Sequence, residues 1–150
     1  MSPNHLTWHS ASPEETEHWG RTLAQTLPRD AFVALHGDLG AGKTAFVRGM
    51  AAQLGDAYAS SPTFGIVHEY DTTPKLFHFD VYRLQGEEDL EAIGFEEYLH
   101  AGGIVVVEWP ERIAAALPAN RWDIHIHTEG ETTRRIEVEH KQQRQQEAPR

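Results

Sequence analysis

A glycine-rich octapeptide lies between two apolar segments of this sequence. In it, a glycine is followed by four residues and then by Gly-Lys-Thr. Glycines allow the backbone to curl so that successive N–H groups point inward, where a Cβ atom would obstruct them. Such a turn binds anions, above all phosphate. Its residues, which we call the phosphate loop, are Gly37, Asp38, Leu39, Gly40, Ala41, Gly42, Lys43 and Thr44.

The segments on either side of the phosphate loop agree with this interpretation. Residues 31–36 form a short apolar run that is typical of a strand buried on both faces. After Thr44, apolar residues recur at helical spacing up to Gly55, which would end a helix. That helix would direct its positive N-terminal end at the bound anion. The alternative is a glycine-rich turn without a ligand, but a chance match in a chain of this length is on the order of one percent or less.

The loop predicts a nucleoside triphosphate and Mg²⁺ as ligands. In this pattern the lysine, here Lys43, contacts the β and γ phosphates, and the hydroxyl of Thr44 binds Mg²⁺. Guanine specificity normally requires an Asn-Lys-x-Asp type of segment. The only asparagines, Asn4 and Asn120, are followed by histidine and arginine. We therefore expect ATP rather than GTP.

Two carboxylates follow apolar runs at positions suited to phosphoryl transfer. Asp80 ends the run 76–79, and Glu108 ends the run 104–107, which is the strongest buried-strand signal in the chain. Groups that hold Mg²⁺ or orient an attacking water are expected at the carboxyl ends of strands beside the loop. The alternative for each residue is a solvated strand end. The sequence leaves open which of the two would position the water.

A turn with hydroxyl side chains, residues 60–63, follows the helix after the phosphate loop. In nucleotide-dependent switches, a hydroxyl in such a segment senses the γ phosphate, and Thr63 is the candidate here. Ser-Pro is also an ordinary turn former, so the pattern alone leaves both interpretations open.

Three further helical segments are predicted. Ser12 and Glu15 form a capping-box pattern at the start of the first helix. Residues 87–100 are acidic and weakly helical, with an interruption at Gly94. A helix is also expected from Pro110, a favourable first residue, through residue 117.

The strand-like segments predict an α/β fold with a mixed parallel and antiparallel sheet. Two hairpins are expected, because each pair of segments flanks a turn-forming sequence. We expect a single domain over residues 1–139 and a solvated tail over residues 140–150. The segments are residues 6–8, the hairpin of 64–70 with 75–82, and the hairpin of 122–127 with 135–139.

Composition excludes several classes of function. Thirteen Lys and Arg residues against 23 Asp and Glu give a net charge of −10, so direct binding of RNA by charge is not expected. The chain has no cysteine, which excludes disulfides and cysteine-ligated metals. His125 and His127 have a spacing that zinc can use, but with ten histidines a surface pair is preferred and no transition metal is assigned. No targeting segment or long apolar run is visible, so we expect a cytoplasmic, soluble protein without a membrane partner.

Four segments in this order resemble the TsaE family, small bacterial P-loop ATPases of tRNA threonylcarbamoyladenosine (t6A) biosynthesis. They are the phosphate loop, Ser-Pro-Thr-Phe at 61–64, His-Phe-Asp-Val-Tyr-Arg at 78–83 and Val-Glu-Trp-Pro at 107–110. The resemblance implies a three-layer α/β P-loop fold with mixed strands. It also implies ATP hydrolysis coupled to a complex with the threonylcarbamoyltransferase TsaD and its paralogue TsaB. The tRNA would then be engaged only indirectly, through that complex.

The resemblance also implies roles for individual residues. Thr44 and Glu108 match the Mg²⁺ ligands, and residues 37–43 match the phosphate-binding segment. Asp80 matches a carboxylate near the γ phosphate, Thr63 a switch-like threonine and Trp109 an aromatic residue beside the site. The match for the adenine is poor, and its expected neighbours are Ser10, Ser12 and either Arg134 or Arg135.

Three hypotheses of function follow. In a regulatory ATPase, water attacks the γ phosphorus while Lys43 and Mg²⁺ stabilise the developing charge, and Asp80 or Glu108 positions the water. The sequence shows no obvious arginine finger, and Arg83 or Arg112 are the least unsuitable residues for that role. Hydrolysis without partners should therefore be slow. The alternative of a small-molecule kinase would need a lid, but residues 86–102 are acidic and lack arginine. A binding module that uses ATP only to order an interface is the third.

Overall fold

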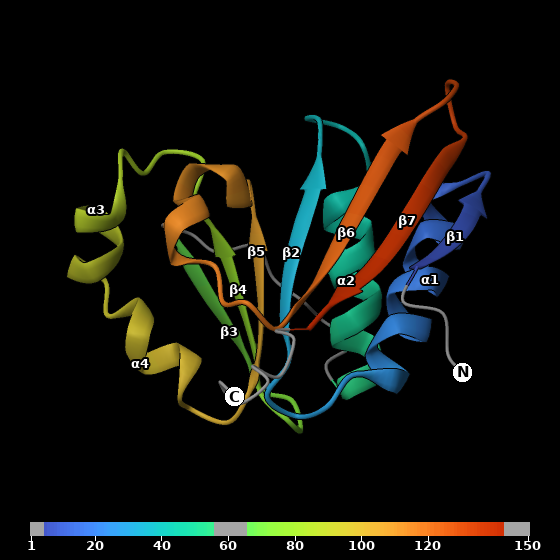
Figure 1. Ribbon diagram of the computed structural model, residues 1–150. Helices are drawn as coiled ribbons and strands as arrows, with labels where there is room; N and C mark the ends of the chain where they lie inside the picture. The colour runs from blue at the N-terminus through green and yellow to red at the C-terminus, as the bar shows by residue number, and fades with distance from the viewer. Residues whose placement is uncertain (1–4, 56–65, 143–150) are drawn as a thin grey trace, which may run out of the picture.

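A computed structural model describes residues 5–55 and 66–142, which form a seven-stranded sheet with helices on its two faces (Figure 1). The order of the strands across the sheet is β1-β7-β6-β2-β5-β4-β3. The strands are β1 (His5–Ser10), β2 (Phe32–Gly37), β3 (Val67–Tyr70), β4 (Leu76–Asp80), β5 (Ile104–Glu108), β6 (Arg121–Thr128) and β7 (Arg134–Lys141).

The sheet is mixed, as the sequence predicts. Strand β2 pairs in parallel with both β5 and β6, and β4 pairs in parallel with β5. The two hairpins, β3–β4 and β6–β7, and the pair β1–β7 are antiparallel. The helices are α1 (Pro13–Thr26), α2 (Lys43–Leu54), α3 (Glu87–Ala92), α4 (Phe95–Leu99) and the 3₁₀ helix η1 (Pro110–Ala116). The predicted three-layer α/β fold is confirmed.

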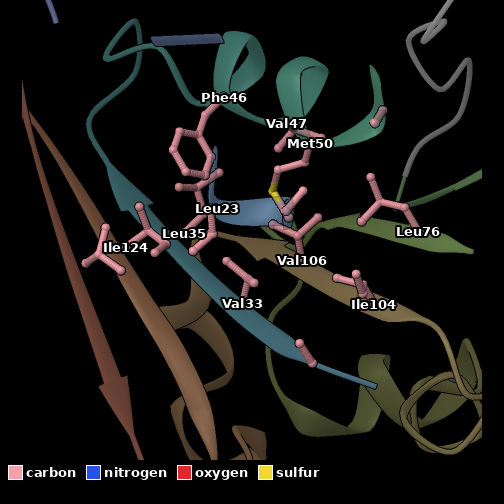
Figure 2. Packing of buried hydrophobic residues seen from close by; sticks show 14 of the residues in the cluster. Leu23, Val33, Leu35, Phe46, Val47, Met50, Leu76, Ile104, Val106 and Ile124 are labelled. Carbon is pink, nitrogen blue, oxygen red and sulfur yellow. The ribbon is translucent and has the colours of Figure 1, made fainter. Parts of the chain in front are cut away.

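Helices α1 and α2 cover one face of the sheet and enclose the larger core (Figure 2). Phe46 and Met50 of α2 lie over Val33 and Leu35 of β2, and all four are fully buried. Leu23 of α1 completes the contact. Since each large apolar side chain contributes roughly 1.5–3 kcal/mol when buried, this layer holds α2 firmly against the central strand.

Two glycines bring the backbones of α1 and α2 into direct contact. A Cβ atom at Gly20 would lie 2.0 Å from the carbonyl oxygen of Phe46, and one at Gly49 would lie 1.9 Å from that of Glu17. No side chain fits at either position without moving the helices apart. The position of α2, and of the loop that precedes it, therefore depends on α1.

The opposite face is covered over β2, β4 and β5 by α3, α4 and η1. Phe95 of α4 packs edge-to-face on Phe32 and Phe79, and Ile113 of η1 is fully buried among them. Among the described residues, this core includes none from β6, β7 or β1. The corresponding face of those strands carries polar side chains, including His125 and His127, whose ring centres are 6.1 Å apart.

Two expectations from the sequence were wrong at their boundaries. The segment after Pro110 is not a continuous helix through residue 117, because Ile113 leaves the helical conformation (φ −130°, ψ 38°) where it enters the core. The solvated tail does not begin at residue 140, because β7 continues through Lys141. The ring of His140 stacks on Trp122, with 3.8 Å between centres, and extends the hairpin.

Asp123 is a buried carboxylate of β6, only 2% exposed, that joins three strands. Its Oδ1 lies 3.0 Å from Nε2 of His36 on β2, and its Oδ2 accepts a hydrogen bond from Nε of Arg121 at 3.1 Å. Lys141 of β7 is 3.5 Å away. Burial by itself would raise the pKa of Asp123, but the hydrogen bonds from His36 and Arg121 outweigh it and lower the pKa from 3.8 to about 2.

Replacing Asp123 by Asn should destabilise the protein at neutral pH. The pKa of Asp123 is lower in the folded protein than in the unfolded chain, so its ionised carboxylate stabilises the fold above pH 3.8. This stabilisation is lost as the pH falls towards 2. The lowered pKa corresponds to about 2 kcal/mol in the free energy of unfolding. Urea unfolding of the wild type and Asp123→Asn should show this difference in the free energy of unfolding at pH 7. Near pH 2.5 the difference between the two proteins should be smaller. Glu139→Gln, opposite Asp123 on β7, is the control. An equal difference at both pH values would contradict the assignment.

Candidate nucleotide-binding site

The phosphate loop connects the end of β2 to the start of α2. Strand β2 ends at Gly37 and α2 begins at Lys43, so the N-terminus of the helix lies at the loop. Gly40 and Gly42 have φ angles of +83° and +111°, a conformation that glycine adopts without strain. The N–H of Ala41 donates to the carbonyl of Asp38 at 3.0 Å and closes the turn. The curled loop and the positive end of a helix are thus present as predicted.

Lys43 is folded over the loop that precedes it. Its Nζ donates a hydrogen bond to the carbonyl oxygen of Gly37 at 2.6 Å and lies 3.6 Å from the centre of the Trp109 ring. Burial lowers the pKa of Lys43, while the carboxylates of Glu108 and Asp80 oppose that effect. The ammonium group of Lys43 is therefore held next to the phosphate loop by a carbonyl, an aromatic ring face and the charges of two carboxylates.

The two predicted carboxylates lie side by side. Asp80 and Glu108 are directly opposite one another on the parallel strands β4 and β5, and Glu108 is also opposite Leu35 of β2. Asp80 is exposed, and its Oδ1 accepts a hydrogen bond from the N–H of Tyr82 at 3.1 Å. Glu108 is 7% exposed. The pair thus combines one solvent-accessible carboxylate with one buried carboxylate.

His78 is a member of the site that the sequence analysis did not identify. Its Nε2 lies 2.5 Å from Oε2 of Glu108, and both side chains are buried. A histidine N–H that donates to a ligating carboxylate orients that carboxylate. The Nδ1 of His78 is buried, with no hydrogen-bond partner among the described residues. The alternation of Leu76, His78 and Asp80 along β4 was the available signal, because it places all three on one face of the strand.

Trp109 flanks the site from the segment after β5. It is the only non-glycine residue with positive φ (64°) in residues 5–55 and 66–142, and it directly precedes η1. Its ring packs against Tyr82 with 4.8 Å between centres, and the guanidinium of Arg112 lies 4.9 Å from the centre of the Tyr82 ring. The expected aromatic neighbour is thus present. A strained backbone beside a candidate site agrees with a functional position.

Of the predicted neighbours of the adenine, Arg134 bonds to the phosphate loop, and Ser10 is linked to it through Thr16. Ser10, 3% exposed, has its Oγ 2.7 Å from Oγ1 of Thr16, whose methyl group would be 3.5 Å from a Cβ at Gly42. The Nε of Arg134 donates to the carbonyl of Ala41 at 2.9 Å. Contacts of these residues with a base stay a prediction.

Arg135, Thr44 and Thr63 complete the set of residues predicted from the sequence. Arg135 forms ion pairs with Glu129 and Glu137, and it alternates in direction with Arg134 along β7. Thr44 is exposed in the first turn of α2. Thr63 and the rest of the switch-like turn lie outside the described residues.

The side chains at the site suit Mg²⁺ bound to a nucleotide. The hydroxyl of Thr44 and the carboxylates of Glu108 and Asp80 are hard oxygen ligands, which Mg²⁺ prefers. His78 engages only Oε2 of Glu108, which leaves Oε1 for another partner. No group of three His, Cys, Asp or Glu side chains in the described segments is arranged to hold a metal ion. Mg²⁺ would therefore complete its coordination with phosphate oxygens and water.

Comparison with known proteins identifies the family. The model of the family "Threonylcarbamoyl adenosine biosynthesis protein TsaE" matches residues 10–136. The chain belongs to the TsaE family. The tRNA threonylcarbamoyladenosine biosynthesis protein TsaE of Bacillus subtilis is 41% identical over 133 residues, which cover 87% of this chain and 83% of that protein. The protein of the same name from Treponema pallidum is 38% identical over 130 residues, or 86% and 96% of the two chains.

A solved structure agrees with membership of the TsaE family. The crystal structure of YdiB from Bacillus subtilis superposes with a TM-score of 0.78 at 35% sequence identity. The match covers 92% of this chain and 86% of that one. Within residues 5–55 and 66–142, no helix has the length and apolar character needed to cross a membrane.

The bond between His78 and Glu108 can be measured by a double-mutant cycle. His78→Leu removes the donor and leaves a buried carboxylate without that bond, so the free energy of unfolding should fall by about 1–3 kcal/mol. In the double variant His78→Leu with Glu108→Ala, the loss should be smaller than the sum of the two single losses. Urea unfolding of the four proteins gives the coupling. Additive losses would show that the contact contributes nothing.

Proposed function

We propose that the protein binds ATP with Mg²⁺, hydrolyses it, and thereby supports the threonylcarbamoyladenosine modification of tRNA. Membership of the TsaE family supports the pathway. The observation that carries the proposed chemistry is the position of Lys43, held over a curled glycine loop beside two carboxylates. This combination matches the parts that a P-loop phosphoryl-transfer site requires.

Each part of the site has a role in this proposal. Backbone N–H groups of the phosphate loop bind the phosphates, and Lys43 leaves Gly37 to contact the β and γ phosphates. Thr44 and Glu108 hold Mg²⁺, which neutralises charge on the phosphate oxygens when bound. His78 keeps the carboxylate of Glu108 in place through Oε2.

Asp80 is the better candidate to orient the attacking water. Glu108 is buried and engaged by His78, which suits a fixed ligand. Asp80 is exposed, and only its Oδ1 has a backbone donor, from Tyr82. Its second oxygen is therefore available to accept a hydrogen bond from water. We accordingly assign metal binding to Glu108 and water positioning to Asp80.

We further propose that the protein acts on a TsaD–TsaB complex and reaches tRNA only through it. The net charge of −10 disfavours direct binding of tRNA by charge. Of the two arginines named above as finger candidates, Arg112 has its guanidinium over the ring of Tyr82, and Arg83 is exposed to solvent. Hydrolysis without a partner should therefore be slow, and contacts with the complex would stimulate it.

Variants of the phosphate loop and of Glu108 test the nucleotide chemistry. Lys43→Ala should abolish ATP binding, because it removes the cation at the phosphates. Thr44→Ala and Glu108→Ala should retain some binding but lower Mg²⁺-dependent hydrolysis by roughly tenfold or more. Isothermal titration and phosphate release measure the two effects. The control is Arg48→Ala on the same helix, whose side chain pairs with Glu17. Turnover at the wild-type rate in all three site variants would exclude this assignment.

Reconstitution with TsaD, TsaB and tRNA tests whether hydrolysis or binding is the required step. We expect a Glu108 variant that binds ATP without hydrolysing it to fail in multiple-turnover modification, with phosphate release and modified tRNA measured in the same reaction. Full modification by such a variant would instead favour a module that uses ATP only to order an interface.

The alternative of a small-molecule kinase has little structural support. The segment that would close over a second substrate forms α3 and α4, whose first turns carry Glu87, Glu88, Asp89, Glu96 and Glu97. An acidic cover is unfavourable over phosphates. A screen of metabolites discriminates the two activities, because a kinase yields a phosphorylated product and an ATPase yields free phosphate.

A further inference from the structure

Arg134 joins the phosphate loop to the turn between β6 and β7. Its Nε donates to the carbonyl of Ala41 at 2.9 Å, and its Nη2 donates to that of Gly40 at 3.3 Å. Its Nη1 donates to the carbonyls of Gly130 at 3.0 Å and Thr133 at 2.9 Å. All four acceptors are backbone oxygens, and two of them belong to the phosphate loop.

We propose that Arg134 is a positioning residue that sets the peptide planes of the phosphate loop for anion binding. In a trans peptide, the N–H points opposite to the preceding carbonyl. Because Arg134 draws the Gly40 and Ala41 carbonyls to its own side, the N–H groups of Ala41 and Gly42 are turned away from it. The N–H of Ala41 closes the turn on Asp38, so the N–H of Gly42 is the one that Arg134 presents to a phosphate.

The loop needs such a restraint because its backbone is otherwise permissive. Gly40 and Gly42 both have positive φ, and glycine has no strong preference between this and other conformations. A Cβ at Gly40 would meet nothing within 4 Å, so no neighbouring atom limits the backbone on that side. The guanidinium supplies the missing contact at two successive carbonyls.

Arg134 is itself held in place by the sheet. It is opposite Ser10 of β1 and Thr128 of β6, so its strand is paired on both sides. Thr16 of α1 lies near Gly42, where a Cβ would be 3.5 Å from its methyl group, and its hydroxyl is bonded to Ser10. Arg134 and Thr16 thus flank the loop from a strand paired on both sides and a packed helix, and a precise binding site is best built on such elements.

The same contacts argue against Arg134 as a direct ligand of the nucleotide. A guanidinium has five N–H groups. Four of them are committed to the four carbonyls, which leaves one N–H of Nη2. The planar guanidinium, whose donors point in fixed directions, suits binding to four carbonyls at once. The ammonium group of a lysine would not reproduce these contacts.

The test compares Arg134→Lys and Arg134→Gln with Arg135→Gln, in which the neighbouring arginine of the opposite face is changed. Because this inference rests on the proposed ATP binding, affinities are measured for ATP, GTP and tripolyphosphate. We expect both Arg134 variants to bind all three ligands roughly tenfold to a hundredfold more weakly, with unchanged ratios between ligands, and Arg135→Gln to bind as the wild type does. Wild-type affinity in Arg134→Lys, or a loss confined to ATP, would overturn the proposal; the latter would indicate a contact with the base.

A second measurement keeps the inference independent of nucleotide binding. Hydrogen exchange in the protein alone should be faster in the peptide that covers residues 37–44 in Arg134→Gln, while the core strands β2 and β5 keep their protection. Unchanged exchange in that peptide would overturn the role of Arg134. Failure of the wild type to bind any nucleotide would count against the proposed function, whereas the exchange result would still decide the role of Arg134.

Discussion

The candidate site depends on the parallel pairing of β2, β5 and β4. This pairing places Leu35, Glu108 and Asp80 opposite one another at the edge where all three strands end, next to the start of the phosphate loop. Side chains alternate along a strand, so a shift of one residue in either pairing would move a carboxylate to the other face of the sheet. The positions of Glu108 and Asp80 at the site therefore depend on the register of the strands. The apolar residues that α1 and α2 bury against those strands specify that register.

Electrostatics at the site is organised around charges that are partly removed from water. Glu108 is buried but has His78 as a hydrogen-bond donor, and Lys43 is buried but has a carbonyl and an aromatic ring as partners. A buried charge is tolerated when such partners replace water. Burial lowers the pKa of Lys43, whereas Glu108 and Asp80 oppose that effect. The lysine that would contact phosphate therefore lies near two carboxylates, and carboxylates are ligands that Mg²⁺ prefers.

The surroundings of the loop illustrate how distant elements support one short segment. Gly20 and Gly49 allow α1 to approach α2 closely, which brings Thr16 of α1 against Gly42. The β6–β7 hairpin brings Arg134 to the carbonyls of Gly40 and Ala41. The N-terminal and C-terminal parts of the chain thus both support the loop, and Figure 1 shows α1, α2, β1 and β7 on the same side of the molecule.

Much of this site could be predicted from sequence, because its signals are local. These signals are properties of neighbouring residues: the spacing from Gly37 to Thr44, the apolar run before it and the helical pattern after it. The carboxylates that end two apolar strands are local signals as well. The alternation along β4 places His78 on the same face as Asp80, but the bond that gives His78 its role, and the contacts of Arg134, could not be predicted in this way. Their partners, Glu108 and Ala41, are 30 and 93 positions away in the chain, and strand pairing brings them together. The extension of β7 to Lys141 and the kink at Ile113 were likewise decided by contacts with Asp123 and with the core, since burial and pairing across the sheet outweigh local preference.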